Sequence, residues 1–137
     1  MEGVKQLFNE IVVGSLATIN DDGSPRAVPV HLFYDGEAVY WFSAEDTVHS
    51  SNVDRDGQAS IALWSPDMTT GARCVYVTGT ANKLDSKQSD DIRELVRMRL
   101  GTVPRNFESA PAYRLPLGTL DEAKSRGNCW YFYTEKI

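Results

Sequence analysis

Hydrophobic residues recur along this chain with two different periods, and each period predicts one kind of element. Near the start, apolar residues are spaced three and four apart, which is typical of one face of a helix. These residues are Val4, Leu7, Phe8, Ile11 and Val12. They predict a short amphipathic helix over residues 3–12, which Gly14 would end. Farther on, short apolar runs alternate with turn signals such as Asp35-Gly36, a pattern typical of β-hairpins.

The apolar runs predict strands over residues 15–20, 24–34, 38–43, 58–65, 73–84, 113–117 and 129–134. The second of these runs contains Pro25 and Pro29. Because proline cannot donate to a strand ladder, this strand should lie at a sheet edge or carry a bulge at Pro29. The run 38–43 is apolar on both faces, which favours a barrel wall packed against another subunit.

Two further helices begin at residues that can cap a helix. Thr47 is placed to cap a helix that continues to about Asp54, and Gly57 would break it. Asp85 begins a second capped helix, with Gln88 in the position of a capping box. The glycine and proline that follow residue 100 predict the end of that helix.

Length and charge restrict the class of protein. A chain of 137 residues suits one domain, so the predicted fold is mainly β: an antiparallel β-barrel with helical inserts over residues 1–137. The net charge of −5 argues against binding to nucleic acid or to acidic membrane surfaces, both of which favour basic proteins. Cys74 and Cys129 fit no zinc or redox spacing, and the first residues lack the pattern of a secretory signal. We therefore expect a cytoplasmic protein with reduced thiols.

Several kinds of chemistry lack the residues they need. No serine or cysteine has a histidine placed locally for nucleophilic catalysis, so no catalytic side chain is assigned. The two histidines, eighteen residues apart, are too few for a metal site, and no carboxylates are spaced to complete one. The glycine-rich loops of dinucleotide and nucleoside triphosphate sites are also absent from the sequence.

The remaining candidate is an anion site in the stretch from residue 26 to residue 53. Arg26 is the only lysine or arginine between residues 5 and 55, and it lies on the strand that contains the prolines. Ser43, Thr47 and His49 follow at a strand end and a helix start, where hydroxyl groups and free amides can hold a phosphate. The alternative is that Arg26 is a surface charge, the two hydroxyl residues only cap the helix, and the histidine is solvated.

A longer pattern runs through the first two-thirds of the chain. It reads GSLATINDDGSPRAVPVHLFYDGEAVYWFSAEDTVHSSNV and is followed by QASIALWS and VYVTGTANKL. It contains an LAT-x-x-x-DG-x-P hairpin, an R-x-x-P strand, a strand that ends in Y-W-F-S and a helix start with the spacing of T-x-K-x-x-N-L. Over residues 13–84 the chain therefore resembles the pyridoxamine 5′-phosphate oxidase-like, FMN-binding split-barrel family.

This resemblance implies a six-stranded split barrel, a homodimer and FMN bound in the groove between the subunits. Arg26 would contact the phosphate, and Ala27, Val28 and Pro29 would lie along the isoalloxazine ring through their backbone. The other implied cofactor residues are Phe42, Ser43, Thr47, Val48 and His49.

Two departures from the family pattern affect the expected function. His49 stands where the family has a phosphate-binding lysine. A neutral imidazole is a weaker partner for a phosphate than a charged one. Because the imidazole loses its charge as pH rises, FMN binding should weaken above neutrality. His31 stands where the oxidases place a substrate-binding lysine; it is a candidate substrate-binding residue, or otherwise an inward-facing core residue. The chain also lacks their C-terminal Arg-x-His segment, so oxidation of pyridoxamine phosphate is not expected.

The leading hypothesis is an FMN-dependent oxidoreductase that acts on a small organic molecule, with NADH or NADPH as a candidate electron donor. A flavin-binding or storage module without a dedicated substrate is one alternative. Haem binding on the same fold, with His31 or His49 as axial ligand, is another. The last alternative is a deazaflavin cofactor, whose acidic tail would need a basic groove. Only the four arginines at residues 93, 97, 99 and 105 could supply that groove, and they also fit a solvated helix face.

Overall fold

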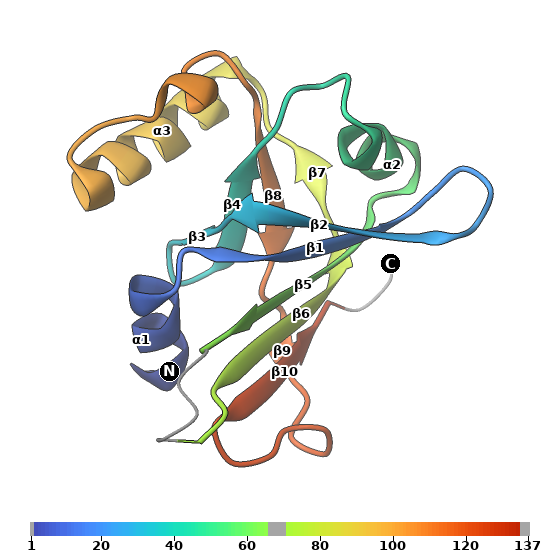
Figure 1. Ribbon diagram of the computed structural model, residues 1–137, viewed down its shortest axis with the longest axis vertical. Coiled ribbons are helices and arrows are strands. Elements are labelled where there is room, and N and C mark those ends of the chain that lie inside the picture. Colours follow the sequence, from blue (N-terminus) through green and yellow to red (C-terminus); the bar gives the residue numbers. More distant parts are fainter. Residues whose placement is uncertain (1, 66–70, 135–137) are drawn as a thin grey trace.

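The computed structural model describes residues 2–65 and 71–134, which form a split β-barrel built from two sheets (Figure 1). Among these residues, the larger sheet has the strand order β2-β1-β5-β6-β10-β9, and the smaller has the order β3-β4-β8-β7. The strands are β1 (Val13–Ile19), β2 (Pro25–His31), β3 (Phe33–Tyr34), β4 (Ala38–Phe42), β5 (Gln58–Trp64), β6 (Cys74–Thr80), β7 (Asn82–Lys83), β8 (Ala112–Pro116), β9 (Thr119–Leu120) and β10 (Cys129–Tyr133). The helices are α1 (Glu2–Glu10), α2 (Val48–Asp56) and α3 (Ser86–Leu100), with a short 3-10 turn η1 (Arg105–Phe107). The prediction of a mainly β barrel with helical inserts is confirmed.

Two of the predicted strands are each divided between the two sheets. The run 24–34 breaks at Leu32, which is fully buried and donates its N–H to the carbonyl of Val12 at 2.8 Å. The run 73–84 breaks at Ala81, which is also buried and donates to the carbonyl of Gly57 at 2.7 Å. At each break the chain leaves the larger sheet and enters the smaller one, so these two buried residues join the halves of the split barrel.

One strand pair departs from the predicted antiparallel arrangement. β10 lies parallel to β6, with Cys129 opposite Cys74, so the larger sheet is mixed. The other strand pairs in both sheets are antiparallel. The parallel pairing is possible because β7, α3 and β8 lie between β6 and β10 along the chain, which gives it the length it needs to return in the same direction.

Gly14 has a different role from the one predicted. It does not end α1, which stops at Glu10; it lies inside β1. A Cβ atom at this position would lie 2.6 Å from the carbonyl oxygen of Ala62 and 2.6 Å from the Leu32 side chain. Glycine is therefore needed here for the close approach of neighbouring backbone, not for helix termination.

The inner side of the barrel is a hydrophobic core covered by α1. Val4, Leu7 and Phe8 of this helix are fully buried and pack against residues of β3, β5 and β6. The strand β4 is buried on both faces, as predicted, but the reason differs from the prediction. Its second face packs against α3 and η1 of the same chain, so this strand does not require a second subunit to cover it.

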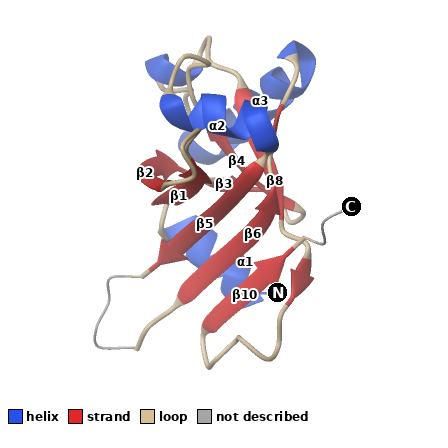
Figure 2. Cartoon of the chain, turned by 90° about the vertical axis from the view of Figure 1, so that its right-hand side faces the viewer, coloured by secondary structure: helices blue, strands red, loops and turns tan. Residues whose placement is uncertain are grey.

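The outer face of the larger sheet is covered by none of the described helices. Figure 2 shows β5, β6 and β10 from this side, with α1 behind them. The outward positions of β1, β2, β5, β6 and β10 include no aspartate, glutamate, lysine or arginine. Three large hydrophobic side chains are exposed there: Val13, Trp64 and Tyr133. An antiparallel sheet face in contact with water normally carries polar and charged residues, so this face has the composition of a buried surface.

Among the described helices, none combines the length and the apolar composition that are needed to cross a membrane.

Candidate functional site

The start of α2 brings together three of the residues predicted to hold a phosphate. Thr47 is the N-cap, with φ −74° and ψ 155°, and its Oγ1 accepts the Ser50 N–H at 3.3 Å. The Nε2 atom of His49 lies 2.8 Å from Ser43 Oγ and 3.4 Å from Thr47 Oγ1. The predicted cap is therefore confirmed, and the strand end and helix start converge as the sequence spacing predicts.

The first turn of α2 retains free backbone donors. The Ser50 and Ser51 N–H groups are taken up by the Thr47 side chain and carbonyl. The N–H groups of Val48 and His49 have no acceptor among the described residues. Two free donors at the positive end of a helix, beside a hydroxyl pair and an imidazole, form a suitable environment for an anion.

The electrostatic environment of His49 is positive. Burial, followed by the nearby Arg26 guanidinium, lowers the pKa of the imidazole from its ordinary value of 6.5. Both causes act against a second positive charge in this place, so the ring is neutral at pH 7 in the protein alone. A bound phosphate would reverse the effect of Arg26 by supplying negative charge.

Arg26 lies on β2, and its side chain is held by the hairpin turn that precedes the strand. Its Nε donates to Asn20 Oδ1 at 3.2 Å, and the same oxygen accepts a hydrogen bond from Asn52 Nδ2 at 3.0 Å. The guanidinium of Arg55 donates to Asn52 Oδ1 at 3.1 Å. None of Asn20, Asn52 and Arg55 was assigned to the site from sequence. The only signal was Asn52, which occupies the asparagine position of the helix-start pattern.

These residues line a pocket of about 600 Å³ between the β1–β2 turn and α2. Two guanidinium groups and three carboxylates line it, and the lining residues are Asn20, Asp21, Asp22, Arg26, Asp46, Val48, Ser51, Asn52 and Arg55. Because the acidic residues outnumber the basic ones, the pocket as a whole does not favour a large anion. The positive charge is concentrated on the side of Arg26 and the start of α2.

The outer edge of β2 is unpaired in the described sheet, as the prolines predict. Its register with β1 is continuous from Val13 opposite His31 to Ile19 opposite Pro25, so there is no bulge at Pro29. Backbone hydrogen bonds join Leu32 to Val12 and Asn20 to Ser24 at the two ends of this ladder, both at 2.8 Å. Hydrogen-bonded and non-hydrogen-bonded pairs alternate along an antiparallel ladder, and residues 24 and 32 both belong to hydrogen-bonded pairs. Residues 25, 27, 29 and 31 therefore turn their backbone groups away from β1, toward the open edge. Both prolines are at these positions, so the ladder loses no donor.

Three residues predicted to lie along the flavin ring also line an apolar groove. Ala27, Val28 and Pro29 form one side of a hollow of about 350 Å³, and Trp64, half exposed at 50%, stands among its other lining residues. The open edge offers the Ala27 N–H and the carbonyls of Ala27 and Pro29. This arrangement can receive a flat heterocycle that has donors and acceptors along one edge.

Phe42 and His31 have surroundings that differ from those expected. The Phe42 side chain is buried and stacked on Phe107, with ring centroids 5.1 Å apart, while the Arg93 guanidinium lies 5.6 Å from its centroid. Only its backbone remains for contact with a ligand. His31 is exposed and is not an inward-facing core residue; its ring meets Phe107 edge-on at 5.7 Å. It lies five residues along β2 from Arg26, roughly 16 Å away, so these two side chains do not meet.

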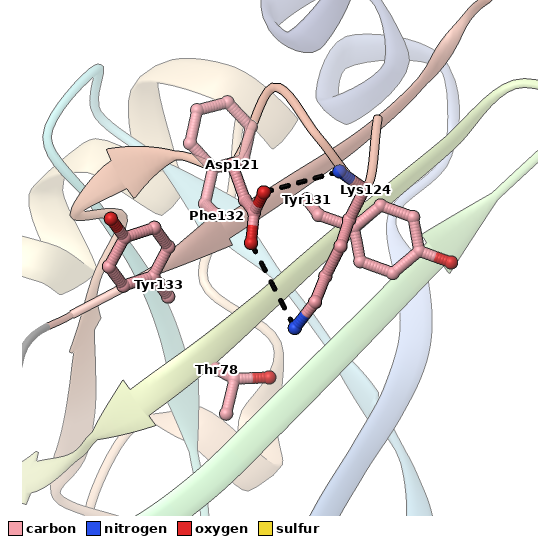
Figure 3. A pocket seen from close by; sticks show the side chains of 6 residues that line it. All are labelled: Thr78, Asp121, Lys124, Tyr131, Phe132 and Tyr133. Carbon is pink, nitrogen blue, oxygen red and sulfur yellow. Dashed lines mark hydrogen bonds and ion pairs between the residues drawn. The ribbon is translucent and has the colours of Figure 1, made fainter. Parts of the chain in front are cut away.

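A second hollow, shown in Figure 3, lies at the other end of the larger sheet. It has a volume of about 330 Å³ and is lined by Thr78, Asp121, Lys124, Tyr131, Phe132 and Tyr133. The Asp121 carboxylate already accepts the backbone N–H of Lys124 at 3.2 Å and faces its ammonium group at 3.9 Å. β10 is four strands from β2 in the sheet, roughly 19 Å, so this hollow is separate from the cluster around His49.

Other groups in the described parts of the chain do not form competing sites. No three His, Cys, Asp or Glu side chains are grouped there as metal ligands. Three of the four arginines considered for a basic groove make internal contacts. Arg93 donates to the carbonyls of Phe107 and Ala110, Arg97 pairs with Glu94, and Arg99 donates to the Tyr34 carbonyl.

Comparison with known proteins adds family and fold to this geometry. Residues 1–122 match the family model described as pyridoxamine 5′-phosphate oxidase. The haem storage protein HutZ from Vibrio cholerae has a similar fold, with TM-score 0.70 and 16% identity over 84% of this chain and 87% of that chain. An F420 reductase matches with TM-score 0.64 and 17% identity, over 82% of this chain and 91% of the other. A haem-binding protein from Mycobacterium smegmatis matches with TM-score 0.65 and 21% identity, over 83% of this chain and 49% of its own length. No curated protein matches the sequence.

Proposed function

The chain belongs to the pyridoxamine 5′-phosphate oxidase family, and on that premise we propose that it is an FMN-binding flavoprotein, an oxidoreductase that acts on a small organic molecule. The observation that carries this proposal is the cluster of Ser43, Thr47 and His49 around the start of α2, with Arg26 close enough to lower the histidine pKa. A cytoplasmic location remains part of the proposal, because Cys74 and Cys129 are both free thiols.

The residues at this end of the barrel fit the phosphate of FMN. The free N–H groups of Val48 and His49, the two hydroxyl groups and the Arg26 guanidinium supply donors for several phosphate oxygens. Hydrogen bonds to a charged group are each worth about 1.5–3 kcal/mol. These contacts would fix one end of the cofactor and favour FMN over flavins that lack a phosphate.

The open edge of β2 fits the ring. The Ala27 N–H and the neighbouring carbonyls can pair with the polar edge of the isoalloxazine, while the apolar groove beside Trp64 would cover its face. Bound FMN would supply the redox chemistry, and the protein would bind and orient it. His31, exposed at the far end of the same strand, is available to contact a substrate.

The outer face of the larger sheet, whose outward strand positions carry no aspartate, glutamate, lysine or arginine, supports the homodimer that the family resemblance implies. Its exposed Val13, Trp64 and Tyr133 would be buried by a second copy, and the edge of β2 would then lie beside the interface. FMN would occupy the groove at that border. The second copy would replace water on the open side of the ring.

The chromophore that co-purifies with the protein is the first test. We expect a yellow protein with a flavin spectrum, and we expect the apoprotein to bind FMN more tightly than riboflavin by about tenfold or more, since the phosphate contacts are charge-assisted. Fluorescence titration with both flavins measures this ratio. Equal affinities would contradict the phosphate site, and a Soret band in place of a flavin spectrum would contradict the cofactor. Reduction of the bound FMN by NADH or NADPH, followed by turnover of an acceptor, would separate an oxidoreductase from a storage module.

Haem binding is the second candidate function, and the surroundings of His31 favour it. Within residues 2–65 and 71–134 the structure gives this exposed imidazole no hydrogen-bond partner, so either nitrogen is available to an iron. Haem titration of the wild type and of His31→Ala would distinguish the two functions. A histidine-dependent Soret shift, without flavin binding, would replace our proposal with this one.

Replacing His49 with lysine tests the phosphate site through its pH dependence. The pKa of His49 is lowered in the free protein and should rise when the phosphate binds. Binding therefore favours the charged imidazole, and FMN affinity is lost as pH rises through the pKa of the FMN-bound protein. Lysine stays charged to about pH 10. The ratio of wild-type to His49→Lys affinity should therefore fall by about tenfold between about pH 6 and about pH 8.5, equivalent to about 1.4 kcal/mol. Titration of the FMN phosphate itself affects both proteins and cancels in the ratio.

Met98→Lys is the matched control for this experiment. It introduces the same charge on the same protein, at a side chain that is 79% exposed on α3. Its pH dependence should follow that of the wild type. If the ratio of wild-type to His49→Lys affinity for FMN is constant over this pH range, the imidazole does not contact the phosphate.

A further inference from the structure

We propose that Asn20 and Asn52 are positioning residues that fix the Arg26 guanidinium for the phosphate of the cofactor, and so set the preference of this protein for FMN over riboflavin. The inference rests on the proposed function, because it assigns a role at the same phosphate site. Neither asparagine needs to touch the cofactor. Their effect would pass through the orientation of Arg26.

The first observation is the hydrogen-bonded chain that ends at Arg26. Asn52 is 2% exposed, and its Nδ2 donates to Thr18 Oγ1 and to Asn20 Oδ1, both at 3.0 Å. Asn20 Oδ1 in turn accepts from Arg26 Nε at 3.2 Å. A buried amide of α2 is thus connected to the guanidinium by one intervening side chain.

The second observation is that the orientation of each amide is determined by its neighbours. Asn20 Nδ2 donates to Ser24 Oγ at 3.1 Å, and Ser24 Oγ donates to Asp22 Oδ1 at 2.5 Å, so the Asn20 oxygen must face Arg26. Asn52 Oδ1 accepts from Arg55 Nη1 at 3.1 Å, which leaves its amide nitrogen as the donor toward Asn20. The arrangement gives Arg55 a supporting role and keeps its charge next to Asn52.

The third observation concerns which atoms of Arg26 remain available. Only its Nε is used by this chain of hydrogen bonds, and the described residues give its two terminal nitrogens no acceptor. A planar guanidinium that is held at one nitrogen presents the other two in a fixed direction. A flexible arginine would lose more side-chain entropy on binding an anion, so the fixed one binds more tightly.

A neutral amide is also the appropriate partner for this purpose. A carboxylate at residue 20 would hold Arg26 as well as asparagine does, but it would neutralise the charge that the phosphate needs. The turn already has two carboxylates, Asp21 and Asp22. The residue that faces Arg26 is nevertheless an asparagine, which orients the guanidinium without competing for its charge.

The test is the ratio of riboflavin to FMN dissociation constants in two variants of Asn20. In Asn20→Asp we expect FMN affinity to fall by about tenfold, and in Asn20→Ala by about threefold, with riboflavin affinity unchanged in both. A purely structural role for Asn20 would change both affinities together or neither. Asn82→Asp is the control, because it adds the same charge at an exposed asparagine whose amide donates to the neighbouring Lys83 carbonyl.

Each outcome separates this inference from the proposed function. If wild-type protein binds the two flavins equally, or binds neither, the proposed function is wrong. If the wild type prefers FMN and both Asn20 variants keep that preference, the positioning role is wrong. If circular dichroism shows that only Asn20→Asp fails to fold, the flavin preference of Asn20→Ala decides whether the positioning role holds. If both fail to fold, Asn20 is a structural residue and the inference is overturned.

Discussion

Replacing Arg26 with alanine is expected to weaken FMN binding by about 10- to 150-fold, corresponding to about 1.5–3 kcal/mol, the range for a hydrogen bond to a charged group. Of the two arginines that line the pocket beside α2, Arg26 is the one whose charge lowers the pKa of His49. Removing it takes away a charge-assisted contact with the phosphate and leaves the edge of β2 in place. Riboflavin, which lacks the phosphate, should therefore bind as before.

Quenching of flavin fluorescence measures both affinities in one titration format. Arg97→Ala is a suitable control, because this arginine is exposed on α3 and pairs with Glu94 on the same helix. It removes the same charge from the whole protein but not from the cluster. A comparable loss of riboflavin binding in Arg26→Ala would indicate damage to the ring groove, and unchanged FMN binding would show that the phosphate lies elsewhere.

The sequence best predicts the elements whose capping and turn residues lie close together along the chain. Thr47 caps α2, Gly57 ends it in the left-handed region with φ 73°, and Asp85 with Gln88 forms the expected capping box. Each signal requires only residues within one turn of one another. The same reasoning explains why the sequence alone groups Ser43, Thr47 and His49: all three lie within seven consecutive residues.

The features that the sequence does not reveal depend on distant partners. Leu32 and Ala81 each stand in an uninterrupted strand pattern, and only burial at the junction of two sheets shows that the strand divides there. The parallel pairing of β10 with β6 joins residues 55 positions apart, such as Cys74 and Cys129. Strand propensity contains no information on which strand will be the partner or in which direction it will run.

The support of Arg26 was missed for a similar reason. Asn20 and Asn52 are 32 residues apart, and they meet only because α2 packs against β1 beside the β1–β2 turn. An asparagine beside a turn is most simply a turn residue. At Phe42 the resemblance implies a cofactor contact, but Phe107, 65 positions later, packs on the side chain and buries it, so that only the backbone of Phe42 remains for this contact.

Substitution of Ala62 by arginine is expected to convert the proposed dimer into monomers and to weaken FMN binding by at least about tenfold. Ala62 lies on β5, in the middle of the outer face of the larger sheet, between Ser15 on one side and Tyr76 on the other. An unpaired charge buried between two copies would lose its hydration, which costs several kcal/mol. FMN affinity should fall with it, because in our proposal the second copy covers the open side of the ring.

Analytical ultracentrifugation measures the change directly. Wild-type protein should sediment as a species of twice 15.3 kDa, and the variant as one of 15.3 kDa. Met98→Arg adds the same charge at a side chain that is 79% exposed on α3, and it should remain dimeric with wild-type affinity. Circular dichroism shows whether each variant keeps its fold, which the outward direction of residue 62 should permit. A wild-type monomer that binds FMN with high affinity would rule out the groove between subunits. It would leave the edge of β2 and the start of α2 as the whole cofactor site, because Arg26, Ser43, Thr47 and His49 all come from one chain.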